Sequence, residues 1–425
     1  MSARRRELAV ALVATGDELV EGRHVDTNSA EIARELLAVG FEPRRFTVLG
    51  DDEDGLVHAL LELAAGHGAI VITGGLGPTL DDVTRHAVAR AAGVALARDE
   101  GVLAGLRERF ARRGRPFAEA NTRQALFPAG AEVLPNANGT AAGFAIPVAG
   151  ALVVALPGPP REMRPMLAEL VVPRLVARVA DLPCVERRAF HLFGLPESAF
   201  ADAAGAWMER GANPLVGVTA SGGRLSVTLR AEAATRAAAR ELADARAAEV
   251  RARFASWIFS EDEPDLAAVL GRELIARGVS VTLAESCTGG LAAERLTRVP
   301  GISAVFGTGF VTYADEAKTR LLGVEPALLA AHGAVSAPVA AAMARGAARH
   351  CGARLAVAIT GIAGPGGGSP EKPVGLVHFG VSVDGVVSTE ERRFLDLGRD
   401  LVRDFAASTA FDLLRKALCG LAPAR

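Results

Sequence analysis

The chain has 425 residues, of which 50% are hydrophobic and 23% charged, and its formal net charge is −2. This length predicts about two to four domains, each large enough to bury a core of its own. The balance of 47 basic and 49 acidic side chains argues against a dedicated nucleic-acid-binding protein, which would carry a basic excess. We therefore expect no direct contact with nucleic acid.

Hydrophobic stretches and cysteines indicate a protein that does not enter a membrane. The longest uncharged stretch, residues 137–160, is broken by glycines and prolines and favours two buried strands over one membrane helix. Residues 1–14 resemble a signal peptide only superficially, because Glu7 interrupts them and no small-residue cleavage site follows. The four cysteines form neither a CxxC pair nor a zinc-ligand spacing, which is typical of reduced thiols. We predict a cytoplasmic location.

Strands alternate with helices over residues 1–175, the first predicted domain. The hydrophobic patterns predict strands at 7–15, 45–49 and 69–73, and helices at 28–39, 53–65 and 82–92. This alternation predicts the α/β class with a parallel, doubly wound sheet. In such sheets ligands bind beyond the carboxyl ends of the strands.

A glycine-rich loop, Thr73 to Thr79, follows the third strand. Its consecutive N–H groups and the helix dipole behind them form an anion site, although the loop matches neither a Walker P-loop nor GxGxxG. The residues expected to contact the anion are Gly74, Gly75, Gly77 and Thr79.

Acidic residues cluster on the loops beside this anion site. Carboxylates next to a phosphate require a hard cation between them, and metal-activated water would then cleave a diphosphate. For any single acid a helix-capping role is the simpler interpretation, but the cluster as a whole favours a phosphate-ligand site. The candidate metal ligands are Asp17, Glu18, Asp26, Asp51, Asp81 and Asp82.

The same residues carry a family resemblance. The segments GDELVEG, VLGDD, TGGLGPTLDDVT and ALPGPPREM resemble the N-terminal domain of the CinA (competence/damage-inducible protein) family, which is similar to molybdopterin-binding proteins. The resemblance covers about residues 7–170 and departs from the family at Ala142, where proline is usual. It implies an ADP-ribose pyrophosphatase that depends on Mg²⁺, Mn²⁺ or Co²⁺, and it adds Asn28 and Asn138 to the site. A binding module for a pterin or nucleotide, without turnover, is the alternative.

Residues 176–260 predict a small α+β domain. Strands are expected at 187–193, 214–219 and 224–230, and helices at 197–209 and 232–253. This part resembles the KH-like domain of the CinA family but lacks a basic GxxG loop, so we infer no RNA binding. A linker, Glu261 to Pro264, leads to a third domain, again α/β, over residues 264–425.

Rare residue types single out one segment of the third domain. The 47 basic residues include only three lysines, and Tyr313 is the only tyrosine. Arginine cannot give up its proton in a protein, whereas lysine can. Lys318, five residues after Tyr313, is therefore a candidate proton-handling group, with chance retention as the alternative.

Ser286 follows a strand predicted at 278–284 and precedes a helix at 291–297. This placement presents the hydroxyl at the sheet edge, where the N–H groups of the helix start would stabilise an oxyanion. No histidine pattern offers a base, but Lys318 would lie early in a helix that Asp315 caps. Tyr313 ends a strand over 308–313 and is expected to reach Lys318 or Ser286. A capping role for Ser286 and a rival nucleophile, Cys287, are the alternatives.

The third domain also carries a resemblance. TLAESCTGGLAAERLT, GTGFVTYADEAKTRLLGV and ITGIAGPGGGSPEKPVGLVHFGV look like the C-terminal CinA domain, which is similar to nicotinamide-nucleotide amidases, over about residues 265–420. It implies hydrolysis of nicotinamide mononucleotide to nicotinate mononucleotide and ammonia without a cofactor. Ser286 would be the nucleophile, with Tyr313 and Lys318 as its proton-handling partners.

Substrate contacts are expected from the loops of the same domain. Arg399 and Arg403 would hold the substrate phosphate, although a solvated arginine face would look the same. The other expected contacts are Thr288, Gly289, Gly290, Gly361 and Gly364. We expect a homodimer that acts on nicotinamide mononucleotide and ADP-ribose. An adaptor role in DNA uptake or recombination is the alternative that the family name suggests.

Overall fold

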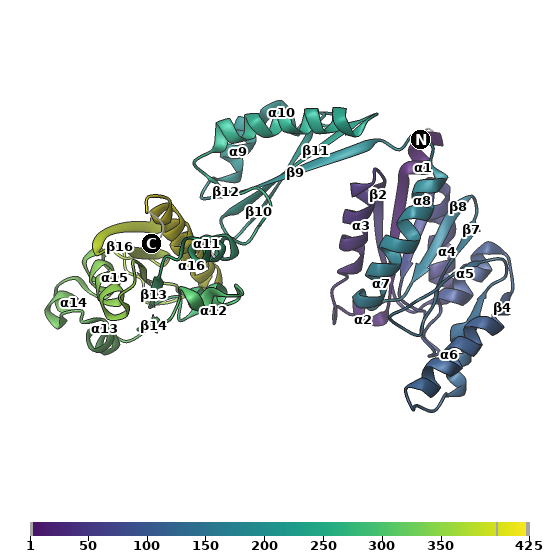
Figure 1. Ribbon diagram of the computed structural model, residues 1–425, viewed down its shortest axis with the longest axis horizontal. Coiled ribbons are helices and arrows are strands. Elements are labelled where there is room, and N and C mark those ends of the chain that lie inside the picture. Colours follow the sequence, from purple (N-terminus) through teal and green to yellow (C-terminus); the bar gives the residue numbers. More distant parts are fainter. Residues whose placement is uncertain (1–2, 397, 422–425) are drawn as a thin grey trace. The chain divides into compact units, whose positions relative to one another are not determined.

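The computed structural model describes residues 3–396 and 398–421 (Figure 1). The chain forms two compact units, residues 1–186 with 231–242 and residues 187–230 with 243–425. The predicted fold class is confirmed: a largely parallel N-terminal sheet, a small middle sheet and a C-terminal α/β sheet.

The first unit contains a six-stranded sheet in the order β2-β1-β3-β8-β7-β6. Its strands are β1 (Ala9–Thr15), β2 (Glu42–Leu49), β3 (Ala69–Thr73), β6 (Glu132–Leu134), β7 (Gly143–Val148) and β8 (Ala151–Leu156). Strands β2, β1, β3 and β8 are parallel, as predicted, whereas β7 pairs antiparallel with both β8 and β6 and so runs opposite to the other five strands. The reason is the two-residue turn Ala149-Gly150, in which both residues have positive φ (46° and 84°), a turn that joins only antiparallel strands.

Helices cover both faces of this sheet. They are α1 (Ala3–Leu8), α2 (Asp17–Val20), α3 (Asn28–Ala38), α4 (Glu53–Gly66), α5 (Thr84–Ala92), α6 (Glu100–Arg112), α7 (Pro160–Met166) and α8 (Val172–Arg178), and β4 (Leu96–Arg98) pairs with β5 (Leu126–Pro128). Alternate residues of β1 face opposite ways: Ala11 and Val13 pack with α4 and α5, and Val10 and Leu12 pack with α3, α7 and α8. The parallel strands β2, β1, β3 and β8 all end at the same edge of the sheet.

Three predicted boundaries in this unit are wrong, and one of them is the start of β2, at Glu42 instead of residue 45. Residues 3–8 form helix α1, so the first strand begins at Ala9 instead of residue 7. The helix expected from Asp82 begins at Thr84. The Asp82 carboxylate instead accepts hydrogen bonds from the backbone N–H groups of Gly77 (2.6 Å) and Thr79 (2.8 Å), which holds this residue in the loop.

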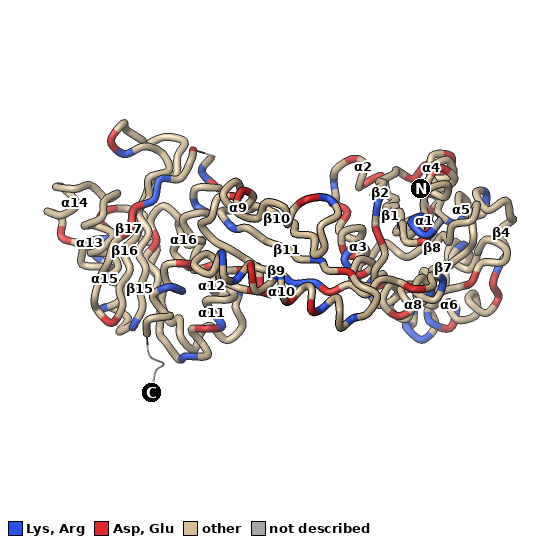
Figure 2. The backbone as a smooth tube through the Cα atoms, turned by 90° about the horizontal axis from the view of Figure 1, so that it is seen from above, with Lys and Arg blue, Asp and Glu red and all other residues tan. Residues whose placement is uncertain are grey.

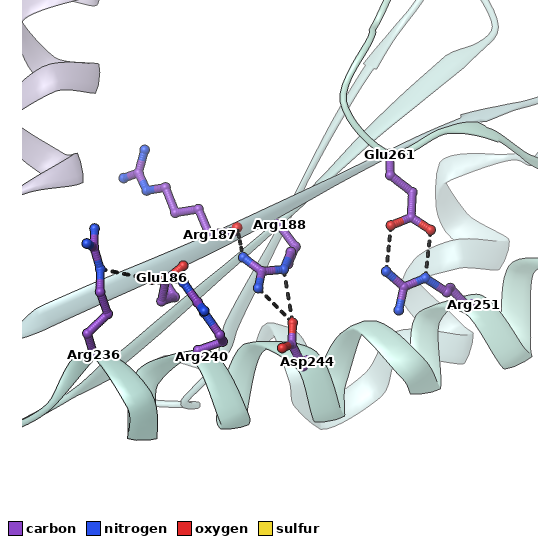
Figure 3. A network of polar contacts seen from close by, with 8 residues as sticks. All are labelled: Glu186, Arg187, Arg188, Arg236, Arg240, Asp244, Arg251 and Glu261. Atoms are coloured by element: carbon purple, nitrogen blue, oxygen red, sulfur yellow. Dashed lines mark hydrogen bonds and ion pairs between the residues drawn. The ribbon is translucent and has the colours of Figure 1, made fainter.

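The middle of the chain forms a four-stranded sheet in the order β10-β11-β9-β12. Its elements are β9 (Cys184–Phe193), α9 (Glu197–Ala204), β10 (Leu215–Ser221), β11 (Arg224–Ala233), α10 (Arg236–Phe254) and β12 (Ile258–Ser260). In the second unit, Arg188 of β9 pairs with Asp244 of α10 at 2.7 Å (Figure 3). Arg251 of α10 pairs with Glu261 at 2.5 Å, which fastens the helix to the segment after β12.

The C-terminal sheet has the order β14-β13-β15-β16-β17. Its strands are β13 (Val281–Glu285), β14 (Gly309–Val311), β15 (Leu355–Gly361), β16 (Leu376–Val383) and β17 (Val386–Arg393), and its helices are α11 (Leu266–Arg277), α12 (Leu291–Thr297), α13 (Asp315–Leu322), α14 (Pro326–His332), α15 (Ala337–Cys351) and α16 (Arg399–Cys419). Strands β14, β13 and β15 are parallel, so the loops after Glu285, Val311 and Gly361 emerge at one edge. Helices α11, α12 and α16 cover one face, and α13 and α15 cover the other.

Basic and acidic residues are interspersed along both units (Figure 2). Over the described part of the chain, no helix combines the length and the apolar character needed to cross a membrane.

Candidate active sites

A cavity of about 270 Å³ lies where the parallel strands of the C-terminal sheet end. Its walls come from the turn after β13, the start of α13, the loop before α15, the glycine-rich loop after β15 and the start of α16. The structure brings together six residues that the sequence singled out: Ser286, Tyr313, Lys318, Gly361, Gly364 and Arg399.

Ser286 is held by the backbone of its turn. Its N–H donates to the carbonyl oxygen of Ile359 (2.9 Å), and its own carbonyl oxygen accepts from Gly289 (3.0 Å). The residue is only 8% exposed, and among the described residues its hydroxyl has no hydrogen-bond partner. The hydroxyl of this largely buried residue, on the wall of a cavity, is thus left to pair with a base or a bound molecule.

Lys318 is a buried lysine, 1% exposed, on helix α13. Its Nζ donates to the carbonyl oxygen of Tyr313 (3.2 Å) and to Oδ1 of Asp315 (3.3 Å). Asp315 was expected to be the N-cap of this helix, but it is the first helical residue. The N-cap is Ala314, whose side chain makes no capping hydrogen bond. Nζ of Lys318 and the Asp315 carboxylate also form an ion pair at 3.3 Å, so both contacts of this amine are to the segment 313–315.

The Tyr313 side chain does not reach Lys318 or Ser286, contrary to expectation. It is 61% exposed, and its hydroxyl accepts a hydrogen bond from Nη2 of Arg399 (2.9 Å). Nη1 of Arg399 donates to the carbonyl oxygen of Gly364 (2.8 Å). Arg399 therefore links Tyr313 to the glycine-rich loop and keeps its remaining N–H donors for another partner.

Cys287, the rival nucleophile, lies beside Ser286 on the cavity wall. Burial raises the pKa of its thiol to about 12, and the Glu285 carboxylate acts in the same direction. The reactive form of cysteine is the thiolate, which is therefore scarce at neutral pH. This environment is that of an unreactive, buried cysteine.

The start of helix α12 does not offer an oxyanion site, which corrects the sequence interpretation. The carboxylate of Glu285, 1% exposed, accepts hydrogen bonds from the N–H groups of Gly290 (3.0 Å), Ala292 (3.0 Å) and Ala293 (2.8 Å). An acid at the end of the strand before a helix was the signal that sequence reasoning overlooked.

Four predicted contacts lie outside the walls of this cavity, as far as the described residues show: Thr288, Gly289, Gly290 and Arg403. Nη2 of Arg403 donates to the carbonyl oxygen of Thr288 (2.8 Å). In this structure Arg403 thus supports the turn that carries Ser286.

A second, larger cavity of about 730 Å³ lies at the carboxyl edge of the N-terminal sheet. Nine predicted residues line it: Glu18, Asp26, Asn28, Asp51, Gly74, Gly75, Gly77, Asp81 and Asp82. Within the described chain, Asp17, Thr79 and Asn138 are not part of its lining. Gly74 has φ of 104°, and a Cβ there would lie 2.4 Å from the carbonyl oxygen of Thr15, so only glycine fits.

The acids of this edge repel one another. Asp17 and Asp51 form a reciprocal pair of hydrogen bonds. The Asp17 carboxylate accepts from the backbone N–H of Asp51 (3.0 Å), and the Asp51 carboxylate accepts from that of Asp17 (3.2 Å). Burial raises the pKa of Asp51, and the carboxylates of Asp17, Asp81 and Glu18 raise it further. A bound cation would relieve this repulsion. Asp26 is engaged differently, because it accepts from the N–H of Ser29 (3.0 Å) at the start of α3.

The oxygen atoms on the walls of this cavity suit a metal ion that is coordinated partly by the protein and partly by a bound molecule. In the part of the chain that the structure describes, no three His, Cys, Asp or Glu side chains are arranged to hold a metal by themselves. Two buried amide oxygens on the cavity wall lack partners, Oδ1 of Asn28 and Oε1 of Gln124. Mg²⁺ is usually held by one or two carboxylates together with substrate phosphates, which suits this set. The sequence interpretation included Asn28 but missed Gln124.

Three ranges of the chain match known protein families. Residues 11–177 match a probable molybdopterin binding domain, 187–260 the damage-inducible protein CinA KH domain, and 263–418 the CinA C-terminal domain. A CinA-like protein of Anaeromyxobacter dehalogenans is 45% identical over 417 residues, which cover 97% of this chain and 100% of that protein. The chain belongs to the CinA family.

Two further proteins are similar in sequence to this chain. A CinA-like protein of Geobacter sulfurreducens is 44% identical over 412 residues, covering 97% of this chain and 99% of that protein. The crystal structure of competence/damage inducible protein CihA from Agrobacterium tumefaciens is 46% identical, with a TM-score of 0.35, and covers 36% of this chain and 96% of that chain.

Proposed function

We propose that the C-terminal part of the chain hydrolyses nicotinamide mononucleotide to nicotinate mononucleotide and ammonia. The observation that carries this proposal is the pair of buried residues, Ser286 and Lys318, on the walls of one cavity. The volume of about 270 Å³ lies just below the usual range of small-molecule sites, about 300–1,000 Å³, and suits a mononucleotide better than a dinucleotide.

The side chains present suffice for the proposed reaction. The neutral amine of Lys318 takes the proton of the Ser286 hydroxyl as Oγ attacks the carboxamide carbon. The amine then returns this proton to the leaving nitrogen, the C–N bond of the tetrahedral adduct breaks, and ammonia departs, leaving an acyl-serine ester. Water, deprotonated by the same amine, hydrolyses the ester and regenerates the hydroxyl. Arg399, oriented by Tyr313 and Gly364, has N–H donors left for the substrate phosphate.

Ammonia release from nicotinamide mononucleotide by the intact protein tests this proposal. We expect ammonia and nicotinate mononucleotide in equal amounts, without added metal and with a chelator present, because no step requires an ion. Nicotinamide riboside, which lacks the phosphate, is the matched substrate and should react more slowly. Absence of ammonia release from the mononucleotide would contradict the proposal.

For the N-terminal domain we propose metal-dependent hydrolysis of ADP-ribose. Its support is the cavity of about 730 Å³, with carboxylates, two unpartnered amide oxygens and a glycine-rich loop on its walls. Asp51 and Asn28 would hold Mg²⁺, Mn²⁺ or Co²⁺, which when bound acts as a Lewis acid toward a phosphate oxygen. Gly74, Gly75 and Gly77 would bring backbone close to the diphosphate.

Replacing Asp51 by asparagine is expected to remove the metal-dependent part of ADP-ribose binding. At a ligand concentration about 100 times Kd, binding stabilises the native state by about 2.7 kcal/mol, so the melting temperature should rise in the wild type with Mn²⁺ present. Asp54→Asn, at an exposed position outside the cavity, is the matched control. Product analysis for AMP and ribose 5-phosphate distinguishes turnover from binding alone, which would favour the binding module. If neither melting nor product formation responds, the proposal is wrong.

The cytoplasmic location, the homodimer and the adaptor role in DNA uptake stay predictions. Ammonia release would separate an amidase from an adaptor without enzymatic activity.

A further inference from the structure

We propose that the loop between α14 and α15 supplies the oxyanion hole of the C-terminal cavity, through the backbone N–H groups of Ala334 and Val335. This inference rests on the proposed amidase reaction. It further assigns Lys372, the third lysine of the chain, as the positioning residue that orients this loop.

Side-chain donors form hydrogen bonds with four consecutive backbone carbonyl groups, from the last residue of α14 into the loop. Nζ of Lys372 donates to the carbonyl oxygens of His332 (2.7 Å) and Val335 (2.8 Å). The Ser336 hydroxyl donates to the carbonyl oxygen of Gly333 (2.9 Å). The buried Thr360 hydroxyl, near the end of β15, donates to the remaining carbonyl, that of Ala334 (2.8 Å). The backbone orientation of this segment is therefore held from four points.

The backbone N–H groups of the same segment differ from its carbonyl groups, because two of them have no hydrogen-bond partner among the described residues. The N–H of Gly333 completes α14 by donating to Leu329 (2.8 Å). For Ala334 and Val335, no hydrogen-bond acceptor is present among residues 3–396 and 398–421. Half-buried backbone donors without a protein acceptor are rare unless water or a ligand binds them.

These donors lie at the reacting group. Ala334 and Val335 line the same cavity as Ser286 and Lys318. The residue Ser286 is more than nine-tenths buried, and its hydroxyl has no hydrogen-bond partner among the described residues, which is an independent sign that this cavity takes a ligand. The alternative donors at the start of α12 are occupied by Glu285.

The chemistry requires donors of this kind. When Oγ of Ser286 bonds to the carboxamide carbon, the C=O π pair moves onto the oxygen, which becomes negatively charged. The same charge develops when water attacks the acyl-serine ester. Removal of one preorganised donor typically costs about 10²–10³-fold in kcat. The dipole of the 15-residue helix α15, which begins just after the loop, adds to the positive potential.

Lys372 is a positioning residue because it touches only loop carbonyls. Lys372→Met removes two of the four anchors, and we expect kcat for ammonia release to fall about 10–100-fold while KM changes little, since small misplacements of catalytic groups have effects of this size. Lys372→Arg keeps the charge and the donors and should restore most of the activity. Lys416→Met, at an exposed lysine of α16, is the control.

An aldehyde analogue of the substrate gives a readout that a merely structural role would not change. The serine hydroxyl adds to the aldehyde carbon, and the resulting hemiacetal oxygen occupies the oxyanion position. In Lys372→Met and in Thr360→Val, which frees the Ala334 carbonyl, we expect affinity for the aldehyde to fall together with kcat while affinity for nicotinate mononucleotide is unchanged.

The outcomes separate this inference from the proposed function. Wild-type protein that releases no ammonia overturns both. An active wild type whose two variants keep kcat and aldehyde affinity overturns the inference alone. Equal loss of aldehyde and product affinity also overturns it, because that result indicates a general disturbance of the cavity.

Discussion

Lys318→Arg is expected to reduce ammonia release by about 10²–10⁴-fold, the usual contribution of general acid–base catalysis. Arginine keeps the positive charge but cannot supply a neutral nitrogen at neutral pH, so it cannot take the proton of Ser286. The site is almost fully buried, and the larger guanidinium would cost about 1–3 kcal/mol through overpacking. A second variant, Lys318→Met, matches the length of lysine without its charge or basicity.

Two controls make the Lys318 result interpretable. Lys416→Arg, at an exposed site paired with Asp412, should leave kcat unchanged. Thermal denaturation followed by circular dichroism shows whether each variant is folded at the assay temperature. Folded Lys318→Arg and Lys318→Met proteins that both retain wild-type kcat would refute a role of this amine as the base.

Ser286→Ala should abolish turnover, with a loss of kcat of about 10³-fold or more, as is typical when a nucleophile is removed. The change deletes a single oxygen atom that has no hydrogen-bond partner among the described residues, so the fold should be unaffected. Affinity for nicotinamide mononucleotide, measured by calorimetry, should remain, because the proposed phosphate contact of Arg399 is intact. A large loss of affinity would instead indicate a binding role for the hydroxyl.

Cys287→Ala is the matched control for the neighbouring thiol. Burial raises the pKa of Cys287 to about 12, so the thiol is protonated in the assay and its removal should change kcat little. If Cys287→Ala inactivates the protein and Ser286→Ala does not, the nucleophile is the cysteine.

The fold was largely predictable because hydrophobic periods and glycine positions are local properties of the chain. Strand β3 and helix α12 occur at the residues that the sequence predicts. The reversal at β7 was missed, because it depends on positive φ at Ala149, a conformation that alanine adopts only when the paired strands impose it.

The candidate sites, too, were only partly predictable from the sequence. Ser286 after a strand and the rare Lys318 were recognisable, since each is unusual in its own segment. The structure alone reveals that the N–H groups at the start of α12 donate to the Glu285 carboxylate. It also reveals that the Tyr313 hydroxyl accepts a hydrogen bond from Arg399. Both outcomes contradict the sequence interpretation, which assumed that neighbours in the chain become partners.

The sequence by itself determined which chemical groups are present and which edge of each sheet carries them, because strand period and turn composition act over a few residues. Only the tertiary structure decided which donor meets which acceptor. Lys372 contacts the carbonyl groups of His332 and Val335, 40 and 37 residues earlier in the chain. Such pairings follow from the packing of whole helices and strands, and that packing decides which backbone groups remain for a substrate.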